Sequence, residues 1–250
     1  MVVLMLVLWL VQLRTKDAGI VDAGWAGGLG LTAIFYAVTT PEAGWRQIIL
    51  AVAAGTWSFR LAGYLLFNRV LRGEEDGRYQ TLRRNWGARA PFYLLLFFEF
   101  QAGLVVLFSI PYLVVARNTI PALGWTDVVG VIILLGAVWG EVTADRQLAR
   151  FRSNPSNRGK TCRVGLWNFS RHPNYFFEWL HWWGYVFLAI GSSWWWIALL
   201  GPGIMLLFLF KITGIPATEK QALASRGEDY RRYQRETSAF IPWPPKKEAR

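Results

Sequence analysis

Seven ionisable residues interrupt long apolar stretches of this 250-residue chain: Asp22, Arg60, Glu99, Glu141, Asp145, Glu178 and His181. An ionisable group inside a membrane is costly, so each of these residues is a candidate for a functional site. Taken singly, each is equally well explained by an interhelical pair that fixes packing, and this explanation is favoured for Glu99. As a set, the seven residues predict a polar cavity lined with Arg, because the acids among them lie beside basic loops. Such a cavity suits an anionic, phosphate-bearing ligand.

Several of these residues recur at helical spacing, which places them on shared helix faces. The sets are Glu141, Asp145 and Arg152; Asn174, Glu178 and His181, continued by Tyr185; and Arg60 with Tyr64.

Familiar catalytic motifs are absent. One Cys and two His supply too few ligands for a His/Cys metal site, and no metal site is expected. Ser170-Arg171-His172 lacks the surrounding sequence of a nucleophile elbow.

The elements that must position these residues are membrane helices. The chain is 54% hydrophobic and only 17% charged, with a mean hydropathy of +0.26. Apolar runs of about 20 residues indicate a bilayer protein rather than a soluble enzyme, a disordered chain or a disulfide scaffold. Seven spans are expected, at about 1–13, 18–40, 46–67, 91–116, 124–145, 175–190 and 193–213. The fold class is therefore all-α and polytopic, and residues 217–235 are expected to form an amphipathic helix.

The net charge of +11 is distributed unevenly. One set of connections holds 23 of the 27 Lys and Arg, whereas the other set has only Arg46 and Arg117. The positive-inside rule then predicts an external N-terminus and a cytoplasmic C-terminus. Membrane lipids are expected partners and nucleic acid is not, because the basic loops adjoin spans. We expect one membrane domain in a bacterial-type inner membrane, with substrate-side helices in 1–145 and the cofactor side in 146–250. Oligomeric state is left open, and a monomer is possible.

Residues 165–179, GLWNFSRHPNYFFEW, form the most informative stretch. His172-Pro173 interrupts the chain before a span, and Pro173 is suited to the first turn of a helix. Asn174 and Tyr175 then lie at a helix N-terminus, where free backbone N–H groups and the helix dipole favour an anion. Arg171 and Arg163 add positive charge. We expect a phosphate or carboxylate cradle at the membrane surface.

This stretch resembles the signature of a bacterial family of membrane proteins related to steroid 5-alpha-reductases. The wider group also includes isoprenylcysteine carboxyl methyltransferases. The tail is similar too, in residues 227–233, GEDYRRY, and 240–242, FIP. The resemblance implies a seven-span enzyme that uses NADPH to reduce a carbon–carbon double bond conjugated to a ketone. The implied substrate is a small steroid-like or other lipid, and the cofactor site faces the cytoplasm.

The resemblance also implies roles for individual residues. Asn174 and Glu178 match positions that contact the nicotinamide half, and Asp145 and Arg152 match positions that hold the cofactor. The further cofactor-binding candidates are Arg60, Asn68, Arg69, Glu141, Arg163, Arg171, His172, Tyr175, Glu219 and Tyr230. Glu141 stands where the reductases have an Asn, and Glu219 stands where they have a His.

The substrate half matches the reductases less well than the cofactor half. Their substrate-polarising Glu has its nearest counterpart in Asp22, with Trp25 about one turn later, and Trp57 stands at their Tyr position. The catalytic candidates are therefore Asp22, Trp25, Trp57 and Tyr64. A protonated Asp22 would donate a hydrogen bond to the enolate oxygen that develops as hydride reaches the enone.

Two other functions stay open. The first is an S-adenosylmethionine-dependent methyltransferase, because Arg171, His172, Pro173, Asn174 and Tyr175 are shared with that branch. The second is a lipid-binding or scaffold membrane protein without catalysis, although the intramembrane charges would be a pure cost to a scaffold.

Overall fold

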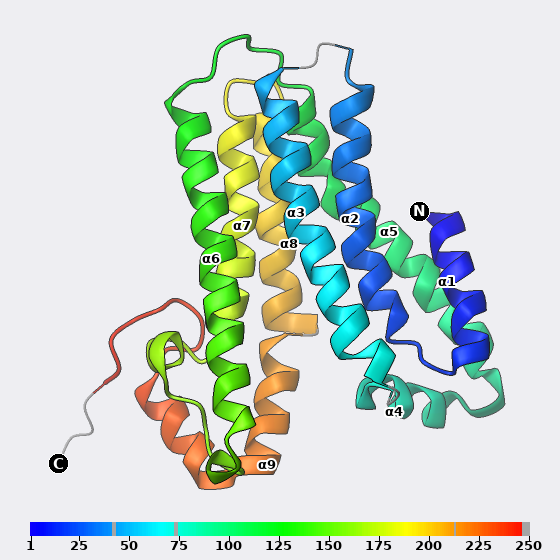
Figure 1. Ribbon diagram of the computed structural model, residues 1–250, viewed down its shortest axis with the longest axis vertical. Helices are drawn as coiled ribbons and strands as arrows, with labels where there is room; N and C mark the ends of the chain where they lie inside the picture. Colours follow the sequence, from blue (N-terminus) through cyan, green and yellow to red (C-terminus); the bar gives the residue numbers. More distant parts are fainter. Residues whose placement is uncertain (42–43, 73–74, 213, 247–250) are drawn as a thin grey trace. The chain divides into compact units, whose positions relative to one another are not determined.

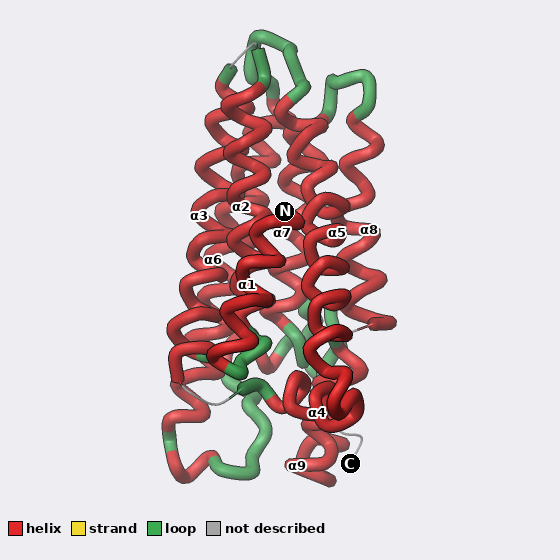
Figure 2. The backbone as a smooth tube through the Cα atoms, turned by 90° about the vertical axis from the view of Figure 1, so that its right-hand side faces the viewer, coloured by secondary structure: helices red, strands yellow, loops and turns green. Residues whose placement is uncertain are grey.

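The computed structural model describes residues 1–41, 44–72, 75–212 and 214–246. Within those residues the chain is helical and contains no strand (Figures 1 and 2). The contacts divide the chain into two compact units. Unit 1 is Met1–Leu123 with Ala189–Ala198, and unit 2 is Gly124–Leu188 with Leu199–Arg250.

Unit 1 contains five α-helices: α1 Val2–Thr15, α2 Ile20–Thr39, α3 Trp45–Asn68, α4 Gly77–Trp86 and α5 Ala90–Ala116. Two short 3₁₀ turns, Val70–Arg72 and Gly87–Arg89, flank α4. Side chains fix several helix starts: Gln47 accepts the backbone N–H of Gly44 at 2.8 Å, and Asp76 accepts that of Arg78 at 2.9 Å. Helix α4 was not expected, because it is polar and lies in a segment assigned to a basic loop.

Glycines on α2 let it approach three other helices of unit 1. A Cβ at Gly30 would lie 2.9 Å from Ser58 Cβ on α3, and one at Gly24 would lie 2.2 Å from Leu8 Cδ1 on α1. At Gly28 the nearest atom of α5 would be Val105 Cγ2, at 3.3 Å. Small residues of this kind allow close helix packing in membranes.

Unit 2 contains α6 Trp125–Ser153, α7 Pro173–Ala189, α8 Leu200–Leu207 and α9 Ile215–Glu236. Helix α7 begins at Pro173, as its sequence predicts, and its last residue belongs to unit 1. Glycines again bring α6 and α7 together, because a Cβ at Gly140 would lie 2.3 Å from the Phe177 ring. Helix α9 agrees with the expected tail helix and is kinked at Gly227, where φ is 54°.

Two predicted spans differ from the structure. Helix α6 continues to Ser153 rather than to residue 145, because its apolar pattern marks only the membrane-facing part of a longer helix. The last apolar stretch is divided into a 3₁₀ segment Trp195–Leu199, then α8, then a π-helical turn Phe208–Ile212. Pro202 lies in the first turn of α8, where a missing N–H costs no helical hydrogen bond.

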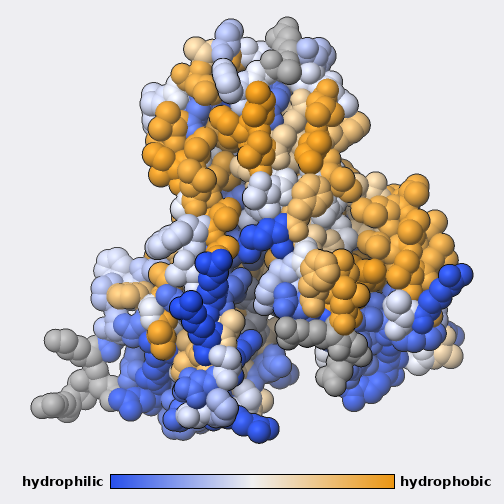
Figure 3. Space-filling model, viewed as in Figure 1, coloured by the Kyte–Doolittle hydropathy of each residue, from blue (hydrophilic) through white to orange (hydrophobic). Residues whose placement is uncertain are grey.

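In the part of the chain that the structure describes, five stretches are long and apolar enough to cross a membrane: Ile20–Thr39, Trp45–Asn68, Gly77–Ala116, Trp125–Ser153 and Trp195–Arg226. Helix α1 has 14 residues and α7 has 17, so each falls short of the ~20 that a span ordinarily needs. Apolar side chains cover much of the visible helix flanks, and strongly hydrophilic side chains gather around α4 in unit 1 and around α9 in unit 2 (Figure 3). The chain is therefore an integral membrane protein.

Candidate functional site

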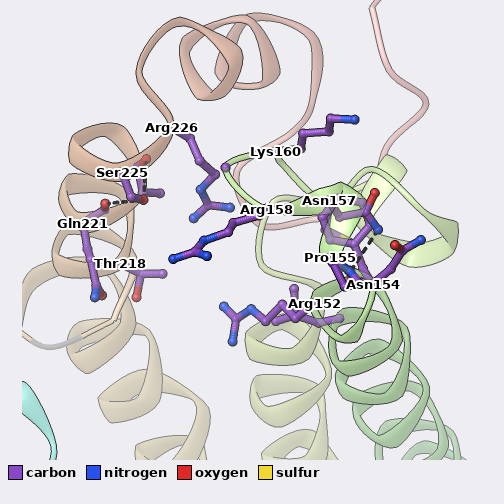
Figure 4. A pocket seen from close by; sticks show the side chains of 15 residues that line it. Arg152, Asn154, Pro155, Asn157, Arg158, Lys160, Thr218, Gln221, Ser225 and Arg226 are labelled. Carbon is purple, nitrogen blue, oxygen red and sulfur yellow. Dashed lines mark hydrogen bonds between the residues drawn. The ribbon is translucent and has the colours of Figure 1, made fainter.

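A cavity of about 800 Å³ lies within unit 2, between the end of α6, the loop after it and α9. We call it the Arg152 cavity, after the α6 residue that lines it. Three more cations line it, Arg158, Lys160 and Arg226, and its lining includes no carboxylate among the described residues. Arg152, Arg158 and Arg226 extend toward one another from three different segments (Figure 4). Like charges gathered in this way favour an anionic ligand.

Neutral polar side chains complete the wall of the Arg152 cavity. Thr218, Gln221 and Ser225 face it from successive turns of α9 (Figure 4). Cys162, the only cysteine of the chain, also lines it and is buried. Burial raises the pKa of the Cys162 thiol, although the nearby Arg152 and Arg226 oppose that shift. The thiol is therefore protonated at neutral pH, and the cavity keeps its net positive charge.

Thr218 connects this cavity to the start of α7. Its hydroxyl oxygen lies 3.3 Å from the Tyr175 hydroxyl oxygen, and the Tyr175 ring stacks on His172 with centroids 5.4 Å apart. The sequence analysis predicted that Tyr175 and His172 hold a cofactor. The structure therefore places them beside the cationic cavity rather than among its charged groups.

Glu219 is the centre of a polar cluster that holds the start of α7 against α9. It accepts hydrogen bonds from Arg171 Nε at 2.7 Å and from Gln234 Nε2 at 2.8 Å. His172 Nε2 lies 3.3 Å from its Oε1, and the Tyr230 hydroxyl lies 3.5 Å away. Burial and the Glu219 carboxylate raise the pKa of Tyr230 to about 12, so its hydroxyl stays a donor at neutral pH. The structure thus brings together four predicted residues, whose side chains contact mainly one another: Arg171, His172, Glu219 and Tyr230.

A second pair of predicted residues joins α7 to α6, nearer to the start of α6 than Arg152 is. Asn174 Nδ2 donates to Asp145 Oδ1 at 3.3 Å, which joins α7 to α6. Asp145 precedes Arg152 by seven residues, about 10 Å along the helix axis. Glu141 lies one turn before Asp145 and is buried, and Glu178 lies one turn after Asn174. One face of α6 therefore joins this acid–amide pair to the cationic cavity.

Arg163 lies outside the cavity and is engaged in ion pairs. Its guanidinium contacts Glu236 at 2.6 Å and Asp229 at 3.4 Å, and it lies over the Tyr233 ring. Burial alone would raise the pKa of Asp229, but hydrogen bonds from Thr161 and the charge of Arg163 lower it below its usual value. Asp229 therefore remains ionised and fixes the loop after α6 to α9.

The C-terminal arm, residues 238–246, closes the other side of the start of α7. Ser170 Oγ donates to the Phe240 carbonyl at 2.7 Å, and Trp243 N donates to the Phe169 carbonyl at 2.9 Å. The Phe240 ring packs on Phe176 and Trp179, with centroids 5.7 Å and 5.6 Å apart. Residues 169–179 of the signature are thus held in place by a segment far from them in sequence.

The remaining predicted residues belong to unit 1. Asp22 accepts hydrogen bonds from Arg78 at 2.9 Å and from the Tyr79 hydroxyl at 2.7 Å. In this arrangement Asp22 is an acceptor, whereas its predicted role needs a donor. Trp25 packs edge-on against Phe108, and Trp57 is fully buried.

The other unit 1 candidates lie on or just after α3. Tyr64 is half exposed, and its carbonyl accepts a hydrogen bond from Asn68 at 3.1 Å. Arg69 lies 3.8 Å from Asp76, and Arg60 lies one turn before Tyr64. Their catalytic and cofactor-binding roles stay predictions.

Sequence reasoning missed Arg158, Lys160 and Arg226 as site residues, although it counted them among the basic residues of the loops and tail. The available signal was the density of cations: Arg152, Arg158 and Lys160 lie within nine consecutive positions, at the end of α6 and in the loop after it. Gln234 carried no signal, because its hydrogen bond to Glu219 joins two parts of α9 on either side of the kink at Gly227.

The fold and this site define a class: a helical integral membrane protein with a cationic cavity of about 800 Å³ at the end of one of its long apolar helices. The model of the family described as "Protein of unknown function (DUF1295)" matches residues 8–237, so the chain belongs to that family. The family is part of the steroid 5-alpha-reductase-related group. An uncharacterized protein of Schizosaccharomyces pombe is 27% identical over 266 residues, covering 94% of this chain and 76% of the relative. No solved structure matches the chain.

Proposed function

We propose that this protein is an NADPH-dependent membrane reductase that acts on a conjugated carbon–carbon double bond of a lipid-like enone. The observation that carries the proposal is the Arg152 cavity, in which four cations and no carboxylate of the described residues surround about 800 Å³. A dinucleotide with a 2′-phosphate has three phosphates to neutralise, which matches this excess of positive charge.

The residues of unit 2 fit such a cofactor from one end to the other. Arg152, Arg158, Lys160 and Arg226 would hold the phosphates, and the Asn174–Asp145 pair, two turns along α6, would orient the nicotinamide end. NADPH supplies a hydride when bound, and reduction of a conjugated double bond also takes up one proton. The chain's own part is to bind, to orient and to exclude water. A hydrogen bond from Asp22, Trp25, Trp57 or Tyr64 to the developing enolate oxygen also belongs to this proposal.

The membrane arrangement is also part of the proposal. Helices α1 and α7 would complete seven passes, with the Arg152 cavity in the cytoplasm of a bacterial-type cell and the substrate taken from the bilayer. Methyl transfer from S-adenosylmethionine is less well supported, because a sulfonium cation would enter a cavity lined by four cations.

The test is thermal unfolding of the detergent-purified protein with NADPH, NADH or S-adenosylmethionine. At about 100 times Kd a ligand adds ~2.7 kcal/mol, which raises Tm by about 5–11 °C in a chain of this size. We expect the largest shift with NADPH, and its loss in Arg152→Ala and Asn174→Ala. Arg150→Ala, an exposed cation on the same helix outside the cavity, is the matched control. A shift with S-adenosylmethionine alone would reassign the cavity to methyl transfer.

A further inference from the structure

A second cavity, of about 520 Å³, lies entirely within unit 1, at the opposite end of α5 from α4. Its wall consists of the last turns of α5, the residues that follow them and the turn at 191–197. We call it the Arg117 cavity. None of its lining residues belongs to the site described above.

This cavity is a built feature of unit 1. Asn118 is buried, and its side-chain amide donates to the Ile190 carbonyl at 3.3 Å, which ties the two wall segments together. Gly191 has a φ of 99°, and a Cβ there would lie 2.5 Å from Ile120 Cδ1. Glycine is required on both grounds, because the backbone is left-handed and the side chain of Ile120 occupies the space.

The wall has two chemically distinct parts. Leu113, Val114 and Ile197 form an apolar side, and Arg117 with Ser192 forms a polar side. Within the described residues, the Arg117 guanidinium makes no hydrogen bond or ion pair. The Ser192 hydroxyl is buried and has no hydrogen-bond partner there. A buried hydroxyl without a partner is costly, so an acceptor supplied by a ligand would relieve it.

Tryptophans mark the depth of the cavity in the membrane. Trp194 lines it, and Trp195 and Trp196 follow directly, all three being exposed. Trp is typical of the headgroup level of a bilayer, where one edge of the ring is wet. The Arg117 cavity therefore lies where lipid phosphates lie.

We propose that the Arg117 cavity binds one anionic phospholipid. Its phosphate accepts hydrogen bonds from Arg117 and Ser192, and one acyl chain lies along Leu113, Val114 and Ile197. The volume is within the range of ligand pockets. A zwitterionic headgroup binds less well, because it brings an ammonium group near the guanidinium of Arg117. This proposal does not depend on the proposed reductase function.

The experiment is native mass spectrometry of the delipidated full chain with phosphatidylglycerol, with phosphatidylcholine or with inorganic phosphate. We expect one retained phosphatidylglycerol and little of the other two. Arg117→Gln should weaken phosphatidylglycerol binding about tenfold, as expected for loss of a charged hydrogen bond. Ser192→Ala should weaken it less. Arg84→Gln, which removes an exposed cation at the other end of unit 1, should bind as the unaltered chain does.

Photocrosslinking keeps the proposal falsifiable if a variant does not fold. Phosphatidylglycerol with a diazirine in its acyl chain, added to the unaltered chain, should label residues 110–114 or 194–197. Labelling confined to other segments would overturn the proposal. So would equal binding by Arg117→Gln and the unaltered chain, equal retention of phosphatidylcholine, or displacement of the lipid by millimolar phosphate.

Discussion

At the scale of single residues, the polar groups of unit 2 are organised around one carboxylate. Glu219 accepts from Arg171 and Gln234 and lies beside His172 and Tyr230, so four groups, two before α7 and two on α9, depend on its charge. Its side chain is only 15% exposed, and that of Arg171 is 11% exposed. A largely buried carboxylate with several charged and polar partners is expensive to neutralise.

We therefore expect Glu219→Gln to destabilise the protein by about 2 kcal/mol or more, because Arg171 loses its counter-charge. Glu228→Gln, on the same helix, removes an exposed carboxylate that pairs with Arg231 and Arg235, and should cost less than about 1 kcal/mol. Thermal unfolding in detergent measures both variants. Equal Tm values for the two would contradict the role given to Glu219.

The sequence was a better guide to which of these residues belong to a site than to how their side chains are paired. The residues HPNY marked the start of α7 correctly, because Pro173 restricts the local backbone whatever surrounds it. No pattern in the sequence predicts that Arg171 pairs with Glu219, 48 positions away, or that Arg163 pairs with Glu236. Those contacts depend on how α9 packs, which local spacing does not encode.

At the scale of elements, close helix packing at glycines positions the site. Gly140 allows the Phe177 ring to lie against the backbone of α6, which brings Asn174 of α7 within reach of Asp145. The approach is too close for any side chain at position 140 without displacement of the ring.

Gly140→Ala should accordingly destabilise the protein by about 1–3 kcal/mol and weaken NADPH binding, since it separates α6 from α7. Gly136→Ala lies one turn earlier on the same helix, and its added methyl group would meet no atom within 4 Å. That control should be neutral or slightly stabilising. Tm and the NADPH-induced shift report both effects, and parallel behaviour of the two variants would disprove the packing argument.

Most helices were predictable because apolar runs reveal membrane segments, and α2, α3 and α5 end within two residues of their expected limits. Helix α4 was missed, because its ten residues are mostly polar and its stability comes from the Asp76 cap and from a tertiary ion pair between Arg78 and Asp22. The division of the last span was missed for a related reason, since hydropathy does not distinguish α, 3₁₀ and π geometry.

At the scale of the whole molecule, the distribution of charge predicts its orientation. Two cations, Arg46 and Arg117, stand apart from the basic connections. Arg46 donates to the carbonyls of Ile120 and Ala122 and so holds the loop after α5. The uneven distribution of the other Lys and Arg residues between the two sets of connections is the basis for placing the Arg152 cavity in the cytoplasm.

Orientation can be tested by labelling with a membrane-impermeant maleimide in a Cys162→Ala background. A cysteine introduced by Ala122→Cys should react in intact bacterial cells, and one introduced by Ser156→Cys only after permeabilisation. Both positions are exposed in the structure, so lack of access within the fold does not explain a difference. The reverse pattern would place the cavity outside the cell.

The attachment of the C-terminal arm also bears on how the protein is made. The signature segment emerges from the ribosome about 60 residues before Phe240, whose ring covers Phe176 and Trp179. Until translation reaches the arm, those aromatic side chains lack their cover, and Ser170 lacks the carbonyl it donates to. A nascent chain stalled before Ser238 therefore presents an aromatic surface that has not yet been covered.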